Sequence, residues 1–309
     1  MESFQPAYVK LHEQGELIKR AERAREYLES CVLCARQCQV NRYEKVGSCR
    51  TGVKARVASF NPHHGEENPL RGRRGSGTIF FSWCNLRCQY CQNADISQAP
   101  AGDEVEPEEL AVIMLWLQNA GCHNINFVSP SHVVAQILQA LPIAVDNGLR
   151  IPLVYNTGGY DSLEALDLLD GVVDIYMPDM KYSDPKVALR MSKIKDYPNV
   201  NKIAVREMHR QVGDLVMDER GIAQRGLLVR HLVLPKGLAG SAKIFRFLAE
   251  EISKNTYLNI MPQYRPAYRA LEYPPFDQPL DGEEYRRAVD LAHSYGLERL
   301  DSRIRWPLF

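Results

Sequence analysis

Hydrophobic positions along the chain change their spacing near residue 77. Before it, residues 8–30 place apolar side chains at helical intervals among charged ones, which predicts an amphipathic helix. Residues 61–77 are rich in Gly and Pro, and we expect them to form a loop. Farther along, short β-rich runs alternate with amphipathic helical stretches. The pattern predicts two domains, an N-terminal extension over residues 1–76 and an α/β domain over residues 77–309.

Successive β-rich runs make up the second domain. They cover residues 78–82, 126–128, 153–155, 172–177, 227–234 and 257–261. Helical patterns lie between and after them, at residues 107–120, 133–146, 162–169, 185–193, 200–212, 242–252 and 283–295. Strands that alternate with helices are typical of parallel βαβ units. About six such units fit, fewer than the eight of a closed barrel, so we expect a partial (β/α)6 TIM-like barrel.

Charge and hydropathy narrow the function classes. The 309 residues include 38 Lys and Arg against 38 Asp and Glu, so the formal net charge is zero. A balanced chain gives no support for a nucleic-acid or lipid-headgroup surface. No apolar run reaches the roughly 18 residues of a membrane-spanning helix, and the N-terminus has no apolar signal core. We therefore expect a soluble cytoplasmic protein.

Cysteine is the residue type that points to chemistry. Seven of the eight cysteines fall into two tight groups, and the eighth is Cys122. Disulfide scaffolds are usually short secreted chains with cysteines spread along them. Closely spaced cysteines in a chain without a signal peptide instead indicate metal or iron–sulfur ligation.

The second group consists of Cys84, Cys88 and Cys91 in a C-x3-C-x2-C pattern directly after a predicted strand. A [4Fe–4S] cluster has four irons, so three thiolates leave one iron open. An open coordination position is the usual mark of a catalytic metal site. The alternative is a structural zinc site completed by Cys122 or His123, although zinc sites more often use paired C-x2-C or C-x4-C spacings.

The segment FFSWCNLRCQYCQNADIS, with Tyr90 as the aromatic residue before the third cysteine, resembles the radical SAM superfamily. It is similar to the pyruvate formate-lyase activating-enzyme branch and, more narrowly, to PflX-like proteins. Stretches such as IPLVYNTGGYDS, VDIYMPDMKY and GLLVRHLVLP fit the same group, so the resemblance covers residues 31–296. One departure is Trp83, where these proteins usually place Gly.

The resemblance implies a reaction and its cofactors. Cys84, Cys88 and Cys91 would hold a [4Fe–4S] cluster whose open iron binds S-adenosylmethionine (SAM). One electron, from a reductant such as flavodoxin or ferredoxin, would cleave SAM to methionine and a 5′-deoxyadenosyl radical that abstracts a hydrogen atom. The substrate would be a glycine of a partner glycyl-radical enzyme, or another protein, peptide or small molecule. A non-catalytic electron-transfer or zinc-binding scaffold is the competing class.

Polar residues at predicted strand ends would complete the SAM site. Ser129 and Ser131 stand where many radical SAM proteins carry Gly-Gly-Glu. In the activating enzymes, the positions of Asn156 and Thr157 carry Asp and Thr, and these flank a monovalent cation beside SAM. Asn156 replaces that Asp and removes one negative charge.

The next two strands supply the charged residues of that site. The resemblance implies that Asp179 contributes to the cation site and that Lys181 reaches the SAM carboxylate. It also implies that Arg230 contacts SAM. The alternatives are an ordinary ion pair for Asp179 and Lys181, and a rim position for Arg230.

The first cysteine group lies in the extension. Cys31, Cys34, Cys38 and Cys49 form a C-x2-C-x3-C-x10-C pattern. Four thiolates can close a tetrahedral zinc site or hold a complete [4Fe–4S] cluster, and the spacing allows both. We expect a second metal here.

Overall fold

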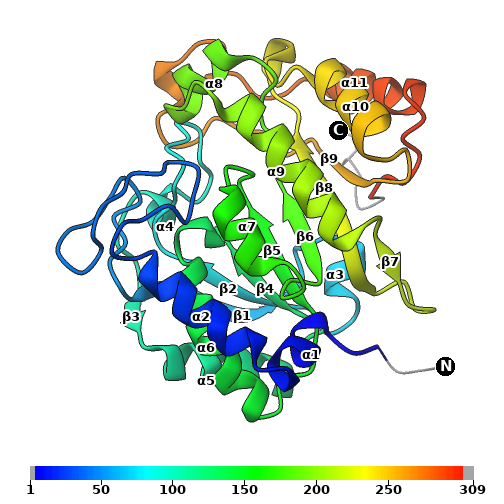
Figure 1. The fold of residues 1–309 in the computed structure, drawn as a ribbon. Coiled ribbons are helices and arrows are strands. Elements are labelled where there is room, and N and C mark those ends of the chain that lie inside the picture. Colours follow the sequence, from blue (N-terminus) through cyan, green and yellow to red (C-terminus); the bar gives the residue numbers. More distant parts are fainter. Residues whose placement is uncertain (1–3, 302–309) are drawn as a thin grey trace.

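The protein is built on one open, mostly parallel β-sheet, seen in a computed structural model that describes residues 4–301 (Figure 1). Six strands are parallel to their neighbours in the order β2-β4-β5-β6-β8-β9. Their bounds are Ser76–Phe81, Ile125–Val128, Leu153–Thr157, Ile175–Pro178, Ala223–Leu232 and Tyr257–Met261. The sheet does not close on itself, which confirms the predicted partial barrel.

Helices connect these strands, as the alternating pattern predicted. Figure 1 shows α6, α7 and α9 in front of the sheet, and α9 packs against β6 and β8. Ser162 begins α7 because its hydroxyl oxygen accepts from the Ala165 amide at 3.2 Å. The helices of the domain are α5 (Pro107–Asn119), α6 (Val134–Asp146), α7 (Leu163–Leu169), α8 (Pro185–Ser192), α9 (Tyr197–Val212), α10 (Ser241–Phe247), which continues as a π-turn to Ile252, and α11 (Gly282–Ser294).

The segment predicted as a loop, residues 61–77, contains the end of one strand and the start of another. β1 (Ala55–His63) pairs antiparallel with β2, with Pro62 opposite Gly77, and β3 (Asp103–Val105) continues the sheet on its other side. The end of β1 was not predicted from the sequence, because Asn61 and Pro62 are residue types that are depleted in strands. The predicted boundary at residues 76/77 falls one residue inside β2, whose antiparallel partner β1 lies in the predicted extension. Residues 302–309 of the second predicted domain lie outside the described part.

The single N-terminal helix predicted over residues 8–30 is two helices. α1 (Ala7–Glu13) and α2 (Glu16–Glu26) meet at Gly15, whose φ of 73° favours glycine. α2 packs on α6, and the Tyr8 hydroxyl donates to the Ile151 carbonyl at 2.8 Å. The extension therefore rests on the barrel rather than standing apart from it.

Loops and short elements complete the described chain. α3 (Asn68–Arg71) follows β1, α4 (Ala94–Ser97) follows the second cysteine group, and β7 (Val216–Met217) forms a hairpin with β8. In Figure 1, α8 lies at the top of the molecule and α4 lies at the left, near mid-height. Across residues 4–301, every helix is too short or too polar to cross a membrane.

One buried carboxyl group ties the first helix to the barrel and makes stability depend on pH. Asp174 is 1% exposed and accepts from the amides of Ala7 at 2.9 Å and Leu153 at 3.0 Å. Burial raises the pKa of Asp174 to about 7. An unfolded chain releases this proton near pH 4, so the group's contribution to stability falls as the pH rises from about 4 to 7.

We therefore expect the unfolding free energy of the wild-type chain to fall more steeply between pH 5 and pH 8 than that of Asp174→Asn. The expected difference is about 2–3 kcal/mol, and urea unfolding at both pH values measures it. Asp167→Asn, which alters an exposed partner of Arg23, is the control and should follow the wild type. Parallel pH curves for wild type and Asp174→Asn would contradict this reading.

Candidate active site

A cavity of about 160 Å³ opens at the carboxyl ends of the parallel strands, where barrel enzymes place their catalytic residues. Its wall is formed by residues of β2, β4, β5 and β8, by α4, and by the loops that follow β2 and β6. All three cysteines of the C-x3-C-x2-C pattern line it, together with Ser129, Asn156, Thr157, Asp179, Lys181 and Arg230. Most of the residues singled out from the sequence thus meet around one space.

The three thiols lie in the loop between β2 and α4, and each has a polar neighbour. The Leu86 amide donates to Cys84 Sγ at 3.4 Å. Cys88 Sγ lies 3.0 Å from Ser192 Oγ, and Cys91 Sγ lies 3.1 Å from the hydroxyl of Ser97.

Burial raises the pKa of Cys84 to about 12, and the charge of Cys88 adds to the rise. Burial also raises the pKa of Cys88, while Lys181 opposes that shift. A bound metal would reverse this direction, because a coordinated thiol is deprotonated.

Asp179 holds two cations against the cavity. Its carboxylate accepts from Lys181 Nζ at 2.5 Å and from Arg230 Nε at 2.9 Å. Arg230 also donates through Nη2 to Asn156 Oδ1 at 2.7 Å. Burial alone would raise the pKa of Asp179, but the two cations outweigh it and lower that pKa. Burial alone would lower the pKa of Lys181, and Asp179 and Cys88 outweigh it in turn.

Backbone pairing fixes where this carboxylate stands. Asp179 follows β6, and its amide donates to the Thr157 carbonyl at 2.9 Å. Its own carbonyl accepts from Tyr197 Oη at 3.0 Å and from Asn201 Nδ2 at 2.9 Å. Gly159 lies beside this carbonyl with a φ of 73°, and a Cβ there would come within 2.4 Å of it. The chain after β6 is therefore held from three sides.

The two serines predicted at the end of β4 separate in the structure. Ser129, with a left-handed φ of 57°, lines the cavity. Ser131 is 1% exposed and shares a 2.9 Å hydrogen bond with the Thr157 hydroxyl, which in turn donates to Asp161 at 2.7 Å. Ser131 thus supports Thr157 from behind the cavity wall.

Tyr90 likewise lies behind the cysteine loop. Its ring stacks on Phe276 with centroids 5.6 Å apart, and its hydroxyl accepts from Tyr182 at 2.7 Å. Tyr182 in turn lies 2.9 Å from Ser192, the hydroxyl neighbour of Cys88. Tyr90 therefore packs the loop in place instead of facing the cavity.

The four cysteines of the extension lie in the loop between α2 and β1. Cys31, Cys34 and Cys49 are buried and Cys38 is half-buried. Over residues 4–301, no three Cys, His, Asp or Glu side chains are grouped so that they could hold a single metal ion. In an iron–sulfur cluster the cysteines bind different irons, so their sulfur atoms need not surround one point.

The sequence matches a known protein family and a relative from an archaeon. The model of the family described as the Radical SAM superfamily matches residues 78–216, which include the C-x3-C-x2-C loop and the ends of β4, β5 and β6. The uncharacterized protein MJ0674 of Methanocaldococcus jannaschii is 34% identical over 289 residues, 90% of this chain and 79% of that protein. The chain belongs to the radical SAM superfamily.

Among solved structures, the crystal structure of Streptococcus suis SuiB bound to precursor peptide SuiA aligns with a TM-score of 0.47 and 10% identity. The alignment covers 69% of this chain and 44% of that one, so this chain spans less than half its length. Membership of the superfamily makes the protein an enzyme, and it implies a [4Fe–4S] cluster and SAM.

Several residues that shape the site of this radical SAM enzyme were missed in the sequence. Tyr197 and Asn201 belong to α9, about twenty residues after Asp179 in the chain, and both donate hydrogen bonds to the Asp179 carbonyl. Asp161, 3% exposed, accepts from Tyr155 at 2.9 Å and from Thr157. The Gly-Gly pair before Tyr160 was the available signal, because adjacent glycines often mark close backbone contacts.

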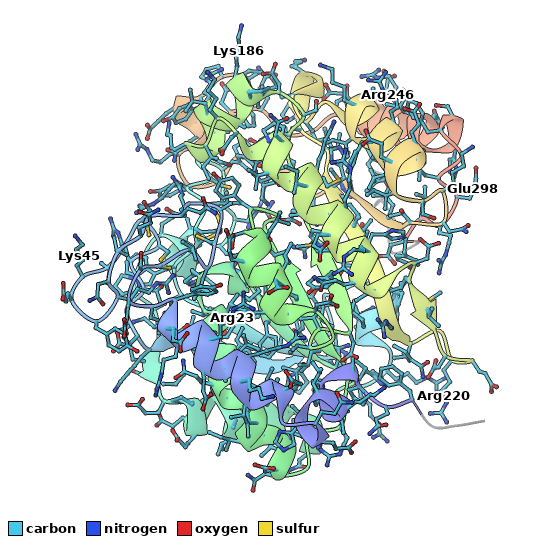
Figure 2. All side chains as sticks on the ribbon, in the orientation of Figure 1. Arg23, Lys45, Lys186, Arg220, Arg246 and Glu298 are labelled. Carbon is cyan, nitrogen blue, oxygen red and sulfur yellow. The ribbon has the colours of Figure 1, made fainter. Side chains whose placement is uncertain are left out.

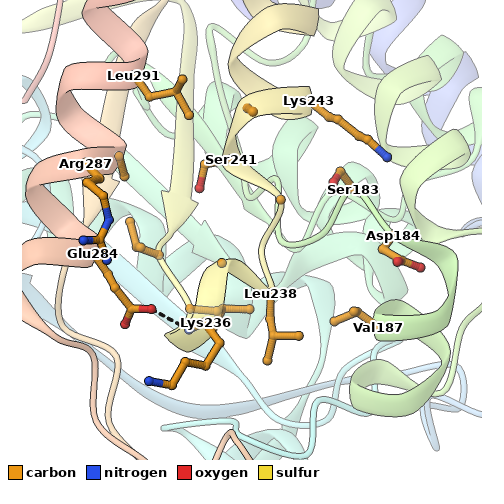
Figure 3. Close-up of a pocket in the computed structure, with 16 residues that line it drawn as sticks. Ser183, Asp184, Val187, Lys236, Leu238, Ser241, Lys243, Glu284, Arg287 and Leu291 are labelled. Atoms are coloured by element: carbon orange, nitrogen blue, oxygen red, sulfur yellow. Dashed lines mark hydrogen bonds between the residues drawn. The ribbon is translucent and has the colours of Figure 1, made fainter.

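A larger cavity of about 500 Å³ lies between α8, α10 and α11 (Figure 3). Its lining carries both signs of charge, with the basic residues Lys236, Lys243 and Arg287 and the acidic residues Asp184 and Glu284. Glu284 accepts from the Lys236 amide at 2.6 Å. No cysteine is among its lining residues in the described chain, so the smaller cavity is the candidate active site.

Gly159→Ala should disturb the site more than backbone strain alone explains. A Cβ at this position would lie 2.2 Å from Asn201 Nδ2 and 2.4 Å from the Asp179 carbonyl. Gly15→Ala is the matched control, because Gly15 has the same φ of 73° in the left-handed region and nothing lies within 4 Å of its Cβ position.

We expect the control to lose about 1 kcal/mol of unfolding free energy and Gly159→Ala to lose several. Denaturant unfolding of both variants measures the difference. Equal losses would show that the space around Gly159 can relax, contrary to this account.

Proposed function

We propose that Cys84, Cys88 and Cys91 hold a [4Fe–4S] cluster with one open iron, and that SAM binds beside it in the 160 Å³ cavity. The observation that supports this proposal is that three thiols and two cationic side chains line the same cavity at the carboxyl ends of the strands. When bound, the cluster and SAM supply a 5′-deoxyadenosyl radical for hydrogen abstraction.

The charge balance of the protein side chains suits an anionic group of SAM. Lys181 and Arg230 contribute two positive charges and Asp179 one negative charge. Their side chains are 18%, 19% and 13% exposed, so water screens them poorly. The net positive charge favours a carboxylate, and a lysine ammonium or arginine guanidinium can donate charge-assisted hydrogen bonds to it.

Cofactor binding needs more room than the cavity offers as described. Small-molecule sites usually enclose roughly 300–1,000 Å³, and this cavity has about 160 Å³. Residues Asn93, Ile96, Ser97 and Gln98 form one wall of it. This wall belongs to α4, which is a single four-residue turn, so we expect it to move outward when cluster and SAM bind.

The monovalent cation implied by the sequence resemblance has less support. Thr157 and Asp179 offer oxygen atoms, but Arg230 donates to Asn156 and to Asp179. A guanidinium at this point repels a second cation. We propose that Arg230 provides at this position the positive charge that a cation provides in the activating enzymes.

The wider function follows from the family and the sequence resemblance. We propose a low-potential reductant such as flavodoxin or ferredoxin, and a protein, peptide or small-molecule substrate in the cytoplasm. Activation of a glycyl-radical enzyme is one such reaction, supported by the PflX-like stretches of the sequence. Superfamily membership favours this class over a non-catalytic electron-transfer or zinc-binding scaffold.

Replacement of Cys84, Cys88 or Cys91 by Ala should each abolish SAM cleavage, because two thiolates cannot retain the site-specific cluster. The measurement is 5′-deoxyadenosine formed after anaerobic reconstitution, reduction and addition of SAM. Cys122→Ala, a buried cysteine away from the cavity, is the control and should keep wild-type yield. A wild-type yield of 5′-deoxyadenosine from any of the three variants would show that the replaced cysteine does not bind the cluster.

Lys181→Ala should weaken SAM binding while leaving the cluster in place. A charge-assisted hydrogen bond contributes about 1.5–3 kcal/mol, which is roughly ten- to a hundredfold in affinity. Lys186→Ala is the control, since Figure 2 shows this side chain extending into solvent. Isothermal titration with SAM and iron analysis separate the two effects. SAM affinity equal to that of Lys186→Ala would show that Lys181 serves only Asp179.

A further inference from the structure

The loop of the extension contains a buried arginine with an incomplete set of partners. Arg42 is 3% exposed and lies among the cysteines of this loop. Its Nε donates to Cys31 Sγ at 3.1 Å and its Nη1 to the His132 carbonyl at 2.6 Å. Its Nη2 is buried and has no hydrogen-bond partner among residues 4–301.

This guanidinium needs an anion. Arginine stays protonated in proteins, and burying an unpaired charge is costly. In the described chain no carboxylate forms an ion pair with Arg42, and a backbone carbonyl offers only a dipole. The groups whose charges reach it are the sulfur atoms of Cys31, Cys34 and Cys49. A neutral thiol is a weak acceptor, whereas a metal-bound thiolate carries negative charge.

We propose that Cys31, Cys34, Cys38 and Cys49 hold a metal–thiolate centre whose negative charge is balanced by Arg42. Four thiolates around one zinc, or around an oxidised [4Fe–4S] cluster, carry a net charge of about −2. The cluster is the better fit to the described residues, because its cysteines bind different irons, whereas one zinc would require the four sulfur atoms to move together around a single point. Either occupant supplies the acceptor that Arg42 Nη2 lacks. The donor set and the buried cation thus fit the same group.

The loop around these cysteines is held by turns, backbone hydrogen bonds and a few core contacts rather than by regular secondary structure. No helix or strand lies between the end of α2 at Glu26 and the start of β1 at Ala55. Gln37, Gln39 and Arg50 adopt left-handed backbone conformations. Gly47 passes so close to Cys38 that a Cβ would lie 2.8 Å from its sulfur. A metal centre would tie these turns together, as in other small metal-bound segments.

The centre is also joined to the catalytic loop of the proposed function. Arg36 Nε donates to the Asn85 carbonyl at 2.9 Å, and Arg87 Nη2 donates to the Ser48 carbonyl at 3.0 Å. The Arg50 guanidinium lies over the Trp83 ring, 5.0 Å from its centroid. These contacts fall on both sides of Cys84. The extension therefore clamps the backbone that presents the first cluster cysteine, and this part of the inference rests on the proposed function.

The backbone conformation of Trp83 gives a reason for these contacts. Its φ of 69° is a conformation that favours glycine, the residue usual at this position in the proteins that the sequence resembles. A non-glycine residue is strained there, and the cation–π contact with Arg50 offsets part of that strain. Arg50 thus stabilises the unusual residue at position 83.

The test uses the full chain with Cys84, Cys88 and Cys91 all changed to Ala, purified without oxygen and analysed for iron, sulfide and zinc. About four irons with four sulfides per folded chain would identify a cluster, and about one zinc would identify a zinc site. A folded chain with neither overturns the proposal. Further replacement of Cys31 and Cys34 should remove the metal. Because the catalytic cysteines are absent, this result does not depend on SAM cleavage.

Arg42→Met tests the counter-charge. We expect its metal to be lost to a competing chelator at roughly ten- to a hundredfold lower chelator concentration, and Arg42→Lys to fall between it and the wild type. Lys45→Met in the same loop is the control, because Figure 2 shows Lys45 extending into solvent. Circular dichroism confirms folding. If Arg42→Met and Lys45→Met retain metal equally, Arg42 is not the counter-charge. If Arg42→Met does not fold, the chelator series on Arg42→Lys decides instead, with wild-type retention as the contradicting result.

Discussion

The geometry of the active-site cavity depends on the Asp179 carboxylate and the two cations that it binds. Its hydrogen bonds to Lys181 and Arg230 join the loop after β6 to the end of β8, at a depth where water screens charge poorly. One negative charge between two positive ones leaves a net positive charge, which a bound anion would neutralise. In the proposed function these charges are in place before SAM binds, and the rearrangement on binding is confined to the α4 wall.

The extension packs against the barrel and contacts the loop that contains Cys84, Cys88 and Cys91. α1 and α2 pack on the barrel, and the loop that follows them reaches the C-x3-C-x2-C segment through arginine contacts on both sides of Cys84. Arg42 links the same loop to His132, which lies beyond the end of β4 and whose ring bonds the Ser82 carbonyl at 2.9 Å. The loops that hold the two cysteine groups are therefore in direct contact with each other.

The sequence predicted those features that depend on local pattern. Alternating strands and helices give the order of the sheet, and residues at the carboxyl ends of parallel strands must meet, so Lys181 and Arg230 could be placed together in advance. Features set by distant contacts could not be predicted. β1 is a strand because β2 and β3 flank it, against the propensity of Pro62. Asn201 reaches the site only because α9 folds back over β6, and no local pattern reports that.

The central claim is that SAM binds the iron that the three cysteines leave open, next to Lys181. Electron–nuclear double resonance on the reduced, anaerobically reconstituted protein, with SAM labelled at its amino nitrogen and carboxylate oxygens, tests it directly. Direct ligation predicts resolved hyperfine coupling from both labels to the cluster spin, and loss of that coupling when Cys84, Cys88 and Cys91 are replaced. A reduced cluster that shows no coupling to bound SAM, or coupling that survives the triple replacement, would contradict the account.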